Sequence, residues 1–249
     1  MSSTVSHRGS ILGPLLFLIY INDIESSTDE NLVLFGDDTT AITKSKHLEL
    51  LIARMKQTLV NLERWFRLSL NVNKTEQIIF SLRNVSSQLQ DENLSDSVKF
   101  LGVYLDGTLV FDQHIEQIAK KLSQVIFLLR TLRGAVDHQV LLMVFNALFQ
   151  SHCSYAILTW GHTAQARIVF KLQSRAIRVV GGQLSKADVE ETFMKLKILT
   201  LPPLFILCSL VYVINNLDRY SLCCNNHYND TRYKKNIHLD YMRLKKITY

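Results

Sequence analysis

Residues 32–42 read LVLFGDDTTAI, in which two short β-prone runs lie on either side of a Gly-Asp-Asp segment. This pattern predicts a β-hairpin, because apolar and β-branched residues favour strands and a glycine beside an aspartate favours a tight turn. Asp37 and Asp38 then lie at the tip of the hairpin. Their carboxylates could hold Mg²⁺, which prefers hard oxygen ligands, although an aspartate pair in a turn more often serves the turn itself.

Asp37 and Asp38 cannot complete a site for two metal ions by themselves. In two-metal phosphoryl transfer, the ions stabilise both the attacking and the leaving oxygen. Successive residues of a strand point to opposite faces, so neighbouring carboxylates do not converge on one point. At least one further carboxylate would have to come from elsewhere in the protein.

The segments on both sides of the hairpin are predicted to be helical. Pro14 can occupy the first turn of a helix that ends near Ser26, since the N–H that proline lacks is not needed there. From His47 to Leu70 the apolar residues recur every three or four positions, which predicts a long amphipathic helix. Two further strands are expected, over residues 75–82 and 100–106.

The chain changes character after residue 112. The apolar spacing there predicts only helices, over residues 114–133, 137–151, 166–180, 187–197 and 203–216. The composition agrees, since 47% of the residues are hydrophobic and there are only 3 prolines and 9 glycines. We therefore expect an α+β fold up to about residue 110 and a helical region after it, with the junction at residues 107–112.

The charge changes at the same place. Residues 1–110 contain 10 Lys and Arg against 13 Asp and Glu, whereas residues 111–249 contain 18 against 9. A basic second half suggests contact with a polyanion such as a nucleic acid. The alternative is a solvated surface with a chance excess of positive charge.

The cysteines and the N-terminal residues indicate where in the cell the protein is expected. Cys153, Cys208, Cys223 and Cys224 form no Cys-x-x-Cys pair, which suggests reduced thiols and an intracellular protein of the cytoplasm, the nucleus or both. The first residues lack the order of features that marks a signal peptide. The apolar run at residues 15–21 is shorter than the roughly 20 residues that a bilayer requires, so no membrane role is expected.

Four segments, in chain order, resemble motifs of the reverse transcriptases of jockey-type non-LTR retrotransposons. They are RGSILGPLLFLIYINDI at residues 8–24, LFGDDTT at 34–40, LNVNKTE at 70–76 and FLGVYLD at 100–106. The helical half has similar landmarks, at residues 121–130, 151–161 and 173–178. The resemblance covers nearly the whole chain.

The resemblance implies a fold and an activity. The fold would be α+β, with a truncated right-hand palm over residues 1–106, an all-helical thumb-like domain over residues 107–217, and a polar, loosely ordered segment over residues 218–249. The activity would be RNA-directed DNA synthesis for a mobile element. It would use an RNA template, a DNA primer, deoxynucleoside triphosphates and Mg²⁺.

The resemblance also implies catalytic roles. Asp37 and Asp38 would form the metal-binding part of the site, with Asp37 as the ligand and Asp38 in electrostatic support. Lys74 would lie near the triphosphate, as a point charge or as a proton donor to the leaving pyrophosphate. The alternative interpretation of Lys74 is an exposed lysine that follows a helix.

Two further groups of residues would contact the substrates. Arg8, Gly9 and Ser10 would lie against the incoming nucleotide or the template. Phe100, Leu101 and Gly102 would form the primer-grip strand, and the alternative there is a plain core strand.

Basic residues of the helical half form a possible nucleic-acid surface. Lys171, Arg175 and Arg178 stand at positions i, i+4 and i+7, so they form one stripe that can follow a phosphate backbone. A solvated helix face is the alternative, and the same two interpretations apply to Lys120, Lys121, Arg130 and Arg133. His152 and Cys153 lack partners at metal-ligand spacing and are expected to be core or surface residues.

Three departures from the family pattern weaken the expectation of activity. The family places another metal-binding aspartate on a palm strand upstream of these motifs, and no substitute is evident here. Arg8 stands where the family usually has glutamine, which can both donate and accept hydrogen bonds. Gly36 replaces a small apolar residue and is expected to loosen the hairpin through its entropy.

We therefore expect a reverse transcriptase fragment that is inactive alone. The alternatives are a non-catalytic nucleic-acid-binding remnant, held by the basic thumb, and an incidental open reading frame. The outer edge of the hairpin is expected to lack its usual neighbouring strand and to be exposed.

Overall fold

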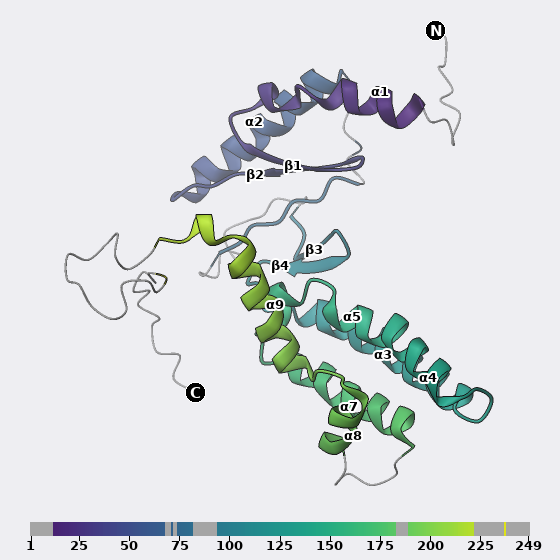
Figure 1. Ribbon diagram of the computed structural model, residues 1–249. Helices are drawn as coiled ribbons and strands as arrows, with labels where there is room; N and C mark the ends of the chain where they lie inside the picture. The colour runs from purple at the N-terminus through teal and green to yellow at the C-terminus, as the bar shows by residue number, and fades with distance from the viewer. Residues whose placement is uncertain are drawn as a thin grey trace, which may run out of the picture. The chain divides into compact units, whose positions relative to one another are not determined.

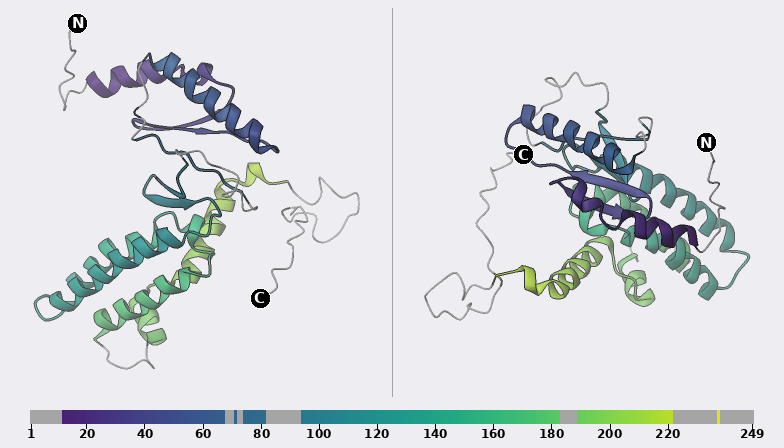
Figure 2. Two further views of the ribbon diagram at one scale, coloured as in Figure 1. Left: turned by 180° about the vertical axis from the view of Figure 1, so that it is seen from behind. Right: turned by 90° about the horizontal axis from the view of Figure 1, so that it is seen from above.

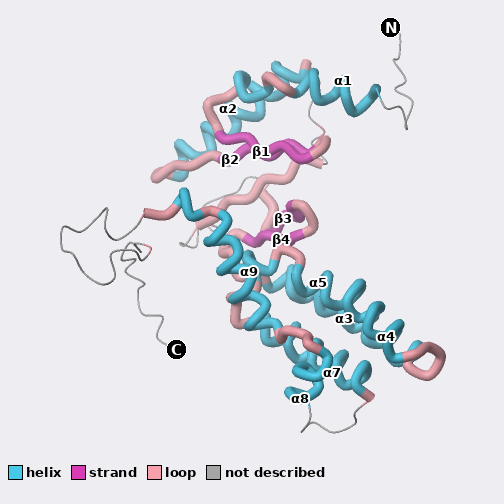
Figure 3. Tube along the Cα trace, in the orientation of Figure 1, coloured by secondary structure: helices cyan, strands magenta, loops and turns pink. Residues whose placement is uncertain are grey.

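The computed structural model describes residues 12–67, 71, 74–81, 94–182, 189–221 and 237 (Figure 1). The chain divides into two compact units, residues 1–76 and residues 77–249. We call them the first and the second unit. The first contains one β-hairpin with helices, and the second contains another hairpin followed by helices only (Figure 3).

The first unit is built around the hairpin that the Gly-Asp-Asp segment predicts. Its elements are α1 (Leu12–Ile21), the 3-10 helix η1 (Ile24–Ser27), β1 (Asn31–Phe35), β2 (Asp38–Ile42) and α2 (Leu48–Phe66). β1 and β2 are antiparallel, and among the described residues they pair only with each other. Each strand of the pair therefore has an outer edge without a strand partner in the described part of the chain.

One face of the hairpin lies against the helices of the first unit. Leu32 packs against a small core of Ile21, Ile24 and Leu62, which come from α1, η1 and α2. Trp65 completes this cluster at the end of α2, where its ring lies 5.2 Å from that of Tyr20. The predicted helix over residues 47–70 is present but ends at Phe66, since Arg67 adopts a left-handed conformation with φ 51°.

The second unit begins with the hairpin of β3 (Ser97–Phe100) and β4 (Val103–Asp106). The helices that follow are α3 (Asp112–Leu132), α4 (His138–Val144), the π-helical stretch η2 (Phe145–Gln150), α5 (Ser151–Ser154), α6 (Ile157–Trp160), α7 (Ala166–Gly181), α8 (Val189–Leu196), α9 (Leu201–Asn215) and the 3-10 helix η3 (Leu217–Arg219). The helices predicted from apolar spacing are confirmed, with ends that shift by a few residues.

The core of the second unit lies between its long helices, and Figure 2 shows α3 and α7 side by side from two further directions. Leu122 and Leu129 of α3 and Ala176 and Ile177 of α7 belong to this core, and all four are fully buried. The stacked rings of Phe145 and Phe149, 5.2 Å apart, fill the space beside them. The regular spacing of the buried residues along α3 and α7 explains why these helices could be predicted from the sequence.

The sequence prediction was wrong for two strands. Residues 74–81 form no strand: they make one isolated bridge, between Gln77 and Leu94, because no neighbouring strand of the described chain runs along them. Residues 100–106 are not one strand either. Leu101 and Gly102, with φ of 45° and 85°, form the two-residue turn between β3 and β4. Positive φ at both positions is typical of type I′ turns.

The predicted boundary between palm and thumb at residues 106–107 remains a prediction about the family's domains. The compact units meet at residues 76–77, so the β3–β4 hairpin belongs to the helical unit. The predicted segment 218–249 lies largely outside the described residues.

Candidate functional site

Asp37 and Asp38 lie at the tip of the β1–β2 hairpin, as the sequence predicts. Phe35 pairs with Asp38, which leaves Gly36 and Asp37 as a two-residue turn. Gly36 has φ +60°, which an L side chain adopts only with strain, so glycine suits this turn. The expectation that Gly36 loosens the hairpin was therefore wrong, because it considered entropy and not the φ angle that the turn requires.

The register places Asp38 on the face of the hairpin that points away from the helices. Asp38 is opposite Phe35 and therefore shares its face, whereas Leu32 is on the other face and packs inward. Both aspartates are exposed, and so are Val33 and Phe35. The tip thus presents two carboxylates beside an uncovered apolar strip.

Asp37 and Asp38 supply the type of ligand that Mg²⁺ prefers, but they are too few to complete its coordination. Mg²⁺ takes oxygen ligands, and aspartate supplies them. Among the described residues, however, no group of three His, Cys, Asp or Glu side chains is placed to hold a metal ion. Asp37 and Asp38 alone therefore do not form a complete metal site.

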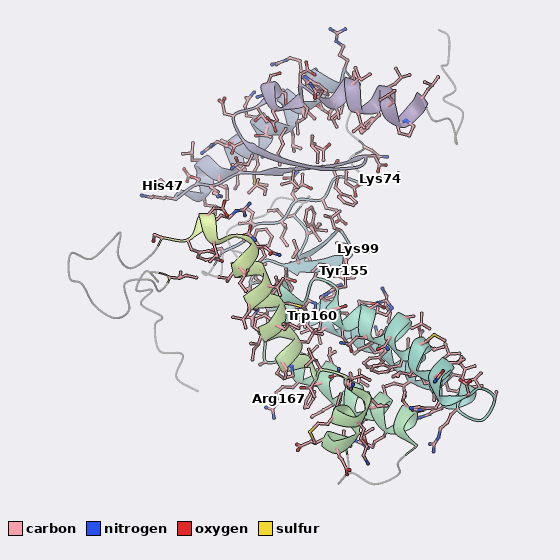
Figure 4. The ribbon with its side chains drawn as sticks, in the orientation of Figure 1. His47, Lys74, Lys99, Tyr155, Trp160 and Arg167 are labelled. Atoms are coloured by element: carbon pink, nitrogen blue, oxygen red, sulfur yellow. The ribbon has the colours of Figure 1, made fainter. Side chains whose placement is uncertain are left out.

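Lys74 follows α2 in the first unit. Its backbone N–H donates a 2.9 Å hydrogen bond to the carbonyl oxygen of Asn71, and its side chain is exposed. In the view of Figure 4, Lys74 is drawn toward the turn end of the hairpin, whereas His47 marks the opposite end. Arg8, Gly9 and Ser10, the other predicted substrate contacts, lie outside the described residues.

Of the predicted primer-grip residues, Phe100 is the last residue of β3, and Leu101 and Gly102 form a turn that a tyrosine contacts. The hydroxyl of Tyr155 donates a hydrogen bond to the carbonyl oxygen of Leu101. A methyl group added to Gly102 would lie 3.6 Å from Cε1 of the same ring. Figure 4 shows Tyr155 beside Lys99, at the β3–β4 hairpin. Sequence analysis noted the motif that contains Tyr155 but gave it no role, since 54 residues separate it from Leu101.

The turn after β4 is fixed by Asp106. Its carboxylate accepts hydrogen bonds from Thr108 N, Thr108 Oγ1, Val110 N and Phe111 N, at 2.6–3.1 Å. Partial burial acts to raise the pKa of Asp106, but these hydrogen bonds outweigh it and lower the pKa below its ordinary value. Asp106 thereby sets the entry into α3.

The basic stripe of α7 is present and lines a pocket. Lys171, Arg175 and Arg178, with Ser174 and Phe170, surround a pocket of about 350 Å³. No carboxylate lines it, and none of the three cations forms an ion pair with a described residue. The Nε of Arg178 is buried and has no hydrogen-bond partner among the described residues. The stripe is thus a set of uncompensated donors suited to an anion.

Arg167 extends the same row toward the start of α7. It precedes Lys171 by four residues, is exposed, and is labelled in Figure 4. Sequence analysis left it out, although the i, i+4 spacing could have identified it. The opposite face of α7 is buried, so this helix has one apolar and one cationic side.

Other candidates prove to be structural. Cys153 is fully buried, and burial raises the pKa of its thiol to about 12. His114 accepts a 3.4 Å hydrogen bond from Tyr104 N through Nδ1 and lies edge-on to the buried Trp160. Burial, followed by the charge of Lys121, lowers the pKa of His114 and of the half-buried His152. These groups belong to the core around α3 and α5.

Comparison with known proteins agrees with the motifs. Residues 2–105 match the family described as reverse transcriptase (RNA-dependent DNA polymerase). Residues 2–105 are a reverse transcriptase domain. The domain covers the first unit and nearly all of the β3–β4 hairpin, so it includes Asp37, Asp38, Lys74 and residues 100–102.

The chain is homologous to polymerases of non-LTR retrotransposons. It is 24% identical over 197 residues to the RNA-directed DNA polymerase from mobile element jockey of Drosophila melanogaster, over 70% of this chain and 21% of that protein. Two probable RNA-directed DNA polymerases of the same fly, from transposons X-element and BS, are 22% and 25% identical over 70% of this chain, and over 21% and 22% of their own lengths. No solved structure matches.

The chain spans about a fifth of the length of the curated relatives it matches. Most of each relative therefore has no counterpart in it.

Proposed function

We propose that this chain is the palm and thumb part of an RNA-directed DNA polymerase of a non-LTR retrotransposon. The observation that carries the proposal is the hairpin of the reverse transcriptase domain, which presents Asp37 and Asp38 together on an exposed tip. The β3–β4 hairpin would close the palm, and the helices from α3 onward would form the thumb. The substrates would be an RNA template, a DNA primer and deoxynucleoside triphosphates.

The residues of the tip would have distinct roles. Asp37 would bind Mg²⁺ and Asp38 would add negative charge beside it; the bound ion would stabilise the charge that develops in phosphoryl transfer. Lys74 would meet the triphosphate, and Arg8, Gly9 and Ser10 would contact the nucleotide or the template. The turn at Leu101 and Gly102 would hold the primer end, which requires that the turn itself be fixed.

We further propose that the tip needs a carboxylate from a palm segment that is not part of this chain. Asp37 lies in the turn and Asp38 at the adjacent strand position. These two aspartates alone would leave most of the coordination sphere of Mg²⁺ to water. An ion held in this way binds weakly and is poorly positioned. The chain alone should therefore not polymerise.

A second candidate function, nucleic-acid binding without catalysis, rests on α7. In the described part of the chain, no acidic residue lines the pocket of Lys171, Arg175 and Arg178, and the buried Nε of Arg178 has no hydrogen-bond partner; Arg167 prolongs this row. Such a row contacts phosphates regardless of base sequence. This binding would serve the polymerase and would also persist in an inactive remnant.

Iron-dependent cleavage of the protein backbone tests the metal-binding role of the tip independently of activity. Fe²⁺ replaces Mg²⁺, and radicals generated with ascorbate and peroxide cut the chain near the bound ion. We expect cuts around residues 36–38 that excess Mg²⁺ suppresses and that Asp37→Asn/Asp38→Asn removes. The matched control is Glu190→Gln/Glu191→Gln, which changes another adjacent and exposed acidic pair. Cuts that are absent, or indifferent to the aspartate substitutions, would refute the metal-binding role.

A further inference from the structure

Helix α9 of the second unit is apolar on every side. From Thr200 to Leu217 the chain contains no charged residue. The first half of α9 is anchored, since Leu201, Leu204, Phe205 and Cys208 pack against the core of the second unit. In the second half Val213 is half-buried, whereas Leu210, Val211, Tyr212 and Ile214 are exposed.

The uncovered residues form a stripe along α9. Ile206, Leu210 and Ile214 are 56%, 56% and 63% exposed and follow one another at intervals of four, so they lie on one side of the helix. Leu207 and Val211 broaden the stripe, and Leu217 prolongs it into η3. Since each residue adds 1.5 Å, the stripe runs for roughly 12 Å between Ile206 and Ile214 alone.

The area of this surface is that of a protein interface. These residues expose on the order of 600 Å², at the upper end of the roughly 300–600 Å² of the largest apolar patch on most monomers. A standard interface buries about 800 Å² on each partner. Covering α9 would therefore supply most of one side of a stable contact.

We propose that α9 packs against α9 of a second copy of this chain. Two identical stripes without charge meet around a two-fold axis without burying an unpaired ion, which is the condition that an isologous interface must satisfy. The pairing is antiparallel, so Leu210, near the middle of the stripe, faces its own counterpart. This inference does not depend on the proposed polymerase function.

A lipid bilayer fits the exposed stripe of α9 less well than a second copy of the chain does. In the described residues no single helix is long and apolar enough to cross a membrane, although α8 and α9 together, bent by 41°, satisfy length and composition. α9 alone has 15 residues and spans about 22 Å, whereas a hydrocarbon core is about 30 Å thick. Helices that lie on membranes carry Lys and Arg on the polar face opposite the apolar one, and α9 carries neither residue.

Sedimentation of the whole chain at several concentrations tests the pairing. We expect a monomer–dimer equilibrium at micromolar concentration, and a dimer dissociation constant at least about 100-fold larger for Leu210→Glu, because two glutamates would face each other. Met143→Glu is the matched control, since Met143 is an exposed apolar residue of α4, away from α9, and should leave the equilibrium unchanged. Circular dichroism verifies that each variant is folded.

Photo-crosslinking provides a second readout that tolerates any loss of stability in Leu210→Glu. A benzophenone side chain at position 214 should yield covalent dimers, and one at position 143 should not. The inference is overturned if the chain sediments as a monomer throughout, if Leu210→Glu dimerises like the wild type, or if Leu16→Glu in the exposed apolar helix α1 breaks the dimer instead. Flotation of the chain with phospholipid vesicles while it remains monomeric would overturn it in favour of membrane binding.

Discussion

The hydroxyl of Tyr155 donates its hydrogen bond to the carbonyl oxygen of Leu101, and so joins the end of α5 to the turn between β3 and β4. The turn consists of two residues with positive φ, one of which, Leu101, is not a glycine. Such a conformation persists only where the surroundings hold it. Tyr155 is therefore a positioning residue for the turn that we propose to hold the primer end.

Tyr155→Phe should lower the free energy of unfolding of the second unit by about 0.5–1.5 kcal/mol, since the ring stays and one hydrogen bond is lost. Urea titration followed by circular dichroism measures this change. Tyr220→Phe is the control, because the structure shows no hydrogen bond from that hydroxyl to a described residue, and it should change stability by less than about 0.5 kcal/mol. If Tyr155→Phe and Tyr220→Phe changed stability equally, Tyr155 would not anchor the turn.

Gln173→Leu should destabilise the second unit by about 2–4 kcal/mol. Gln173 is fully buried, donates from Nε2 to Leu199 O and accepts from Leu201 N, both at 3.0 Å. Leucine would leave the buried N–H of Leu201, at the start of α9, and the partly buried carbonyl of Leu199 without the amide that pairs with them. The same titration on Gln124→Leu, an exposed position of α3, should show almost no change. A neutral result at Gln173 would mean that water replaces its side chain.

Asp106→Asn should destabilise the second unit at neutral pH and much less in acid. The folded-state pKa of Asp106 is lowered, so its stabilising effect is complete above the unfolded pKa of about 3.8 and disappears as the pH falls through the lower folded value. At pH 7 we expect a loss of about 1–2 kcal/mol, because the amide oxygen replaces only one carboxylate oxygen, and its NH2 group cannot accept the hydrogen bond that Oδ2 receives from Phe111 N. Stabilities measured from pH 7 to pH 2.5 should converge at the acid end, and a constant difference would contradict this assignment.

Arg175→Ala and Lys171→Ala should each weaken nucleic-acid binding to a similar degree for any sequence. Each should also reduce the dependence of log K on log salt by about one unit, because one phosphate contact is lost. Fluorescence anisotropy with labelled RNA–DNA duplexes at several salt concentrations measures both quantities. Lys195→Ala is the control, since Lys195 is exposed on α8 and paired with Glu191 at 2.8 Å. An unchanged salt slope in the α7 variants would favour a solvated helix face.

The sequence predicted the features that depend on local spacing. The apolar positions of α3 and α7 determine both helices to within two residues at each end, and Gly182, with φ 75°, ends α7 as its type suggests. The β1–β2 hairpin follows from one Gly-Asp pair between two β-prone runs.

Features that depend on distant partners could not be predicted in this way. Residues 75–82 have strand-like composition, but a strand requires a continuous neighbour. In the described chain the segment makes only an isolated bridge to Leu94 and single backbone hydrogen bonds with Ser95 and Gly107. Gly102 was a visible signal for a turn inside residues 100–106, yet the leucine before it masked the type I′ pattern. The contact between Tyr155 and Leu101 joins residues that no periodicity connects.

Primer extension tests the central claim, that Asp37 and Asp38 form one part of a polymerase metal site. An RNA template with an annealed DNA primer, deoxynucleotides and Mg²⁺ is supplied to the chain alone, and to the chain joined to an upstream palm segment that carries a further aspartate. We predict no extension by the chain alone. The joined protein should extend the primer, and Asp37→Asn/Asp38→Asn should reduce this extension by more than about 100-fold. Extension by the chain alone, or by a joined protein that is indifferent to both aspartates, would contradict the account.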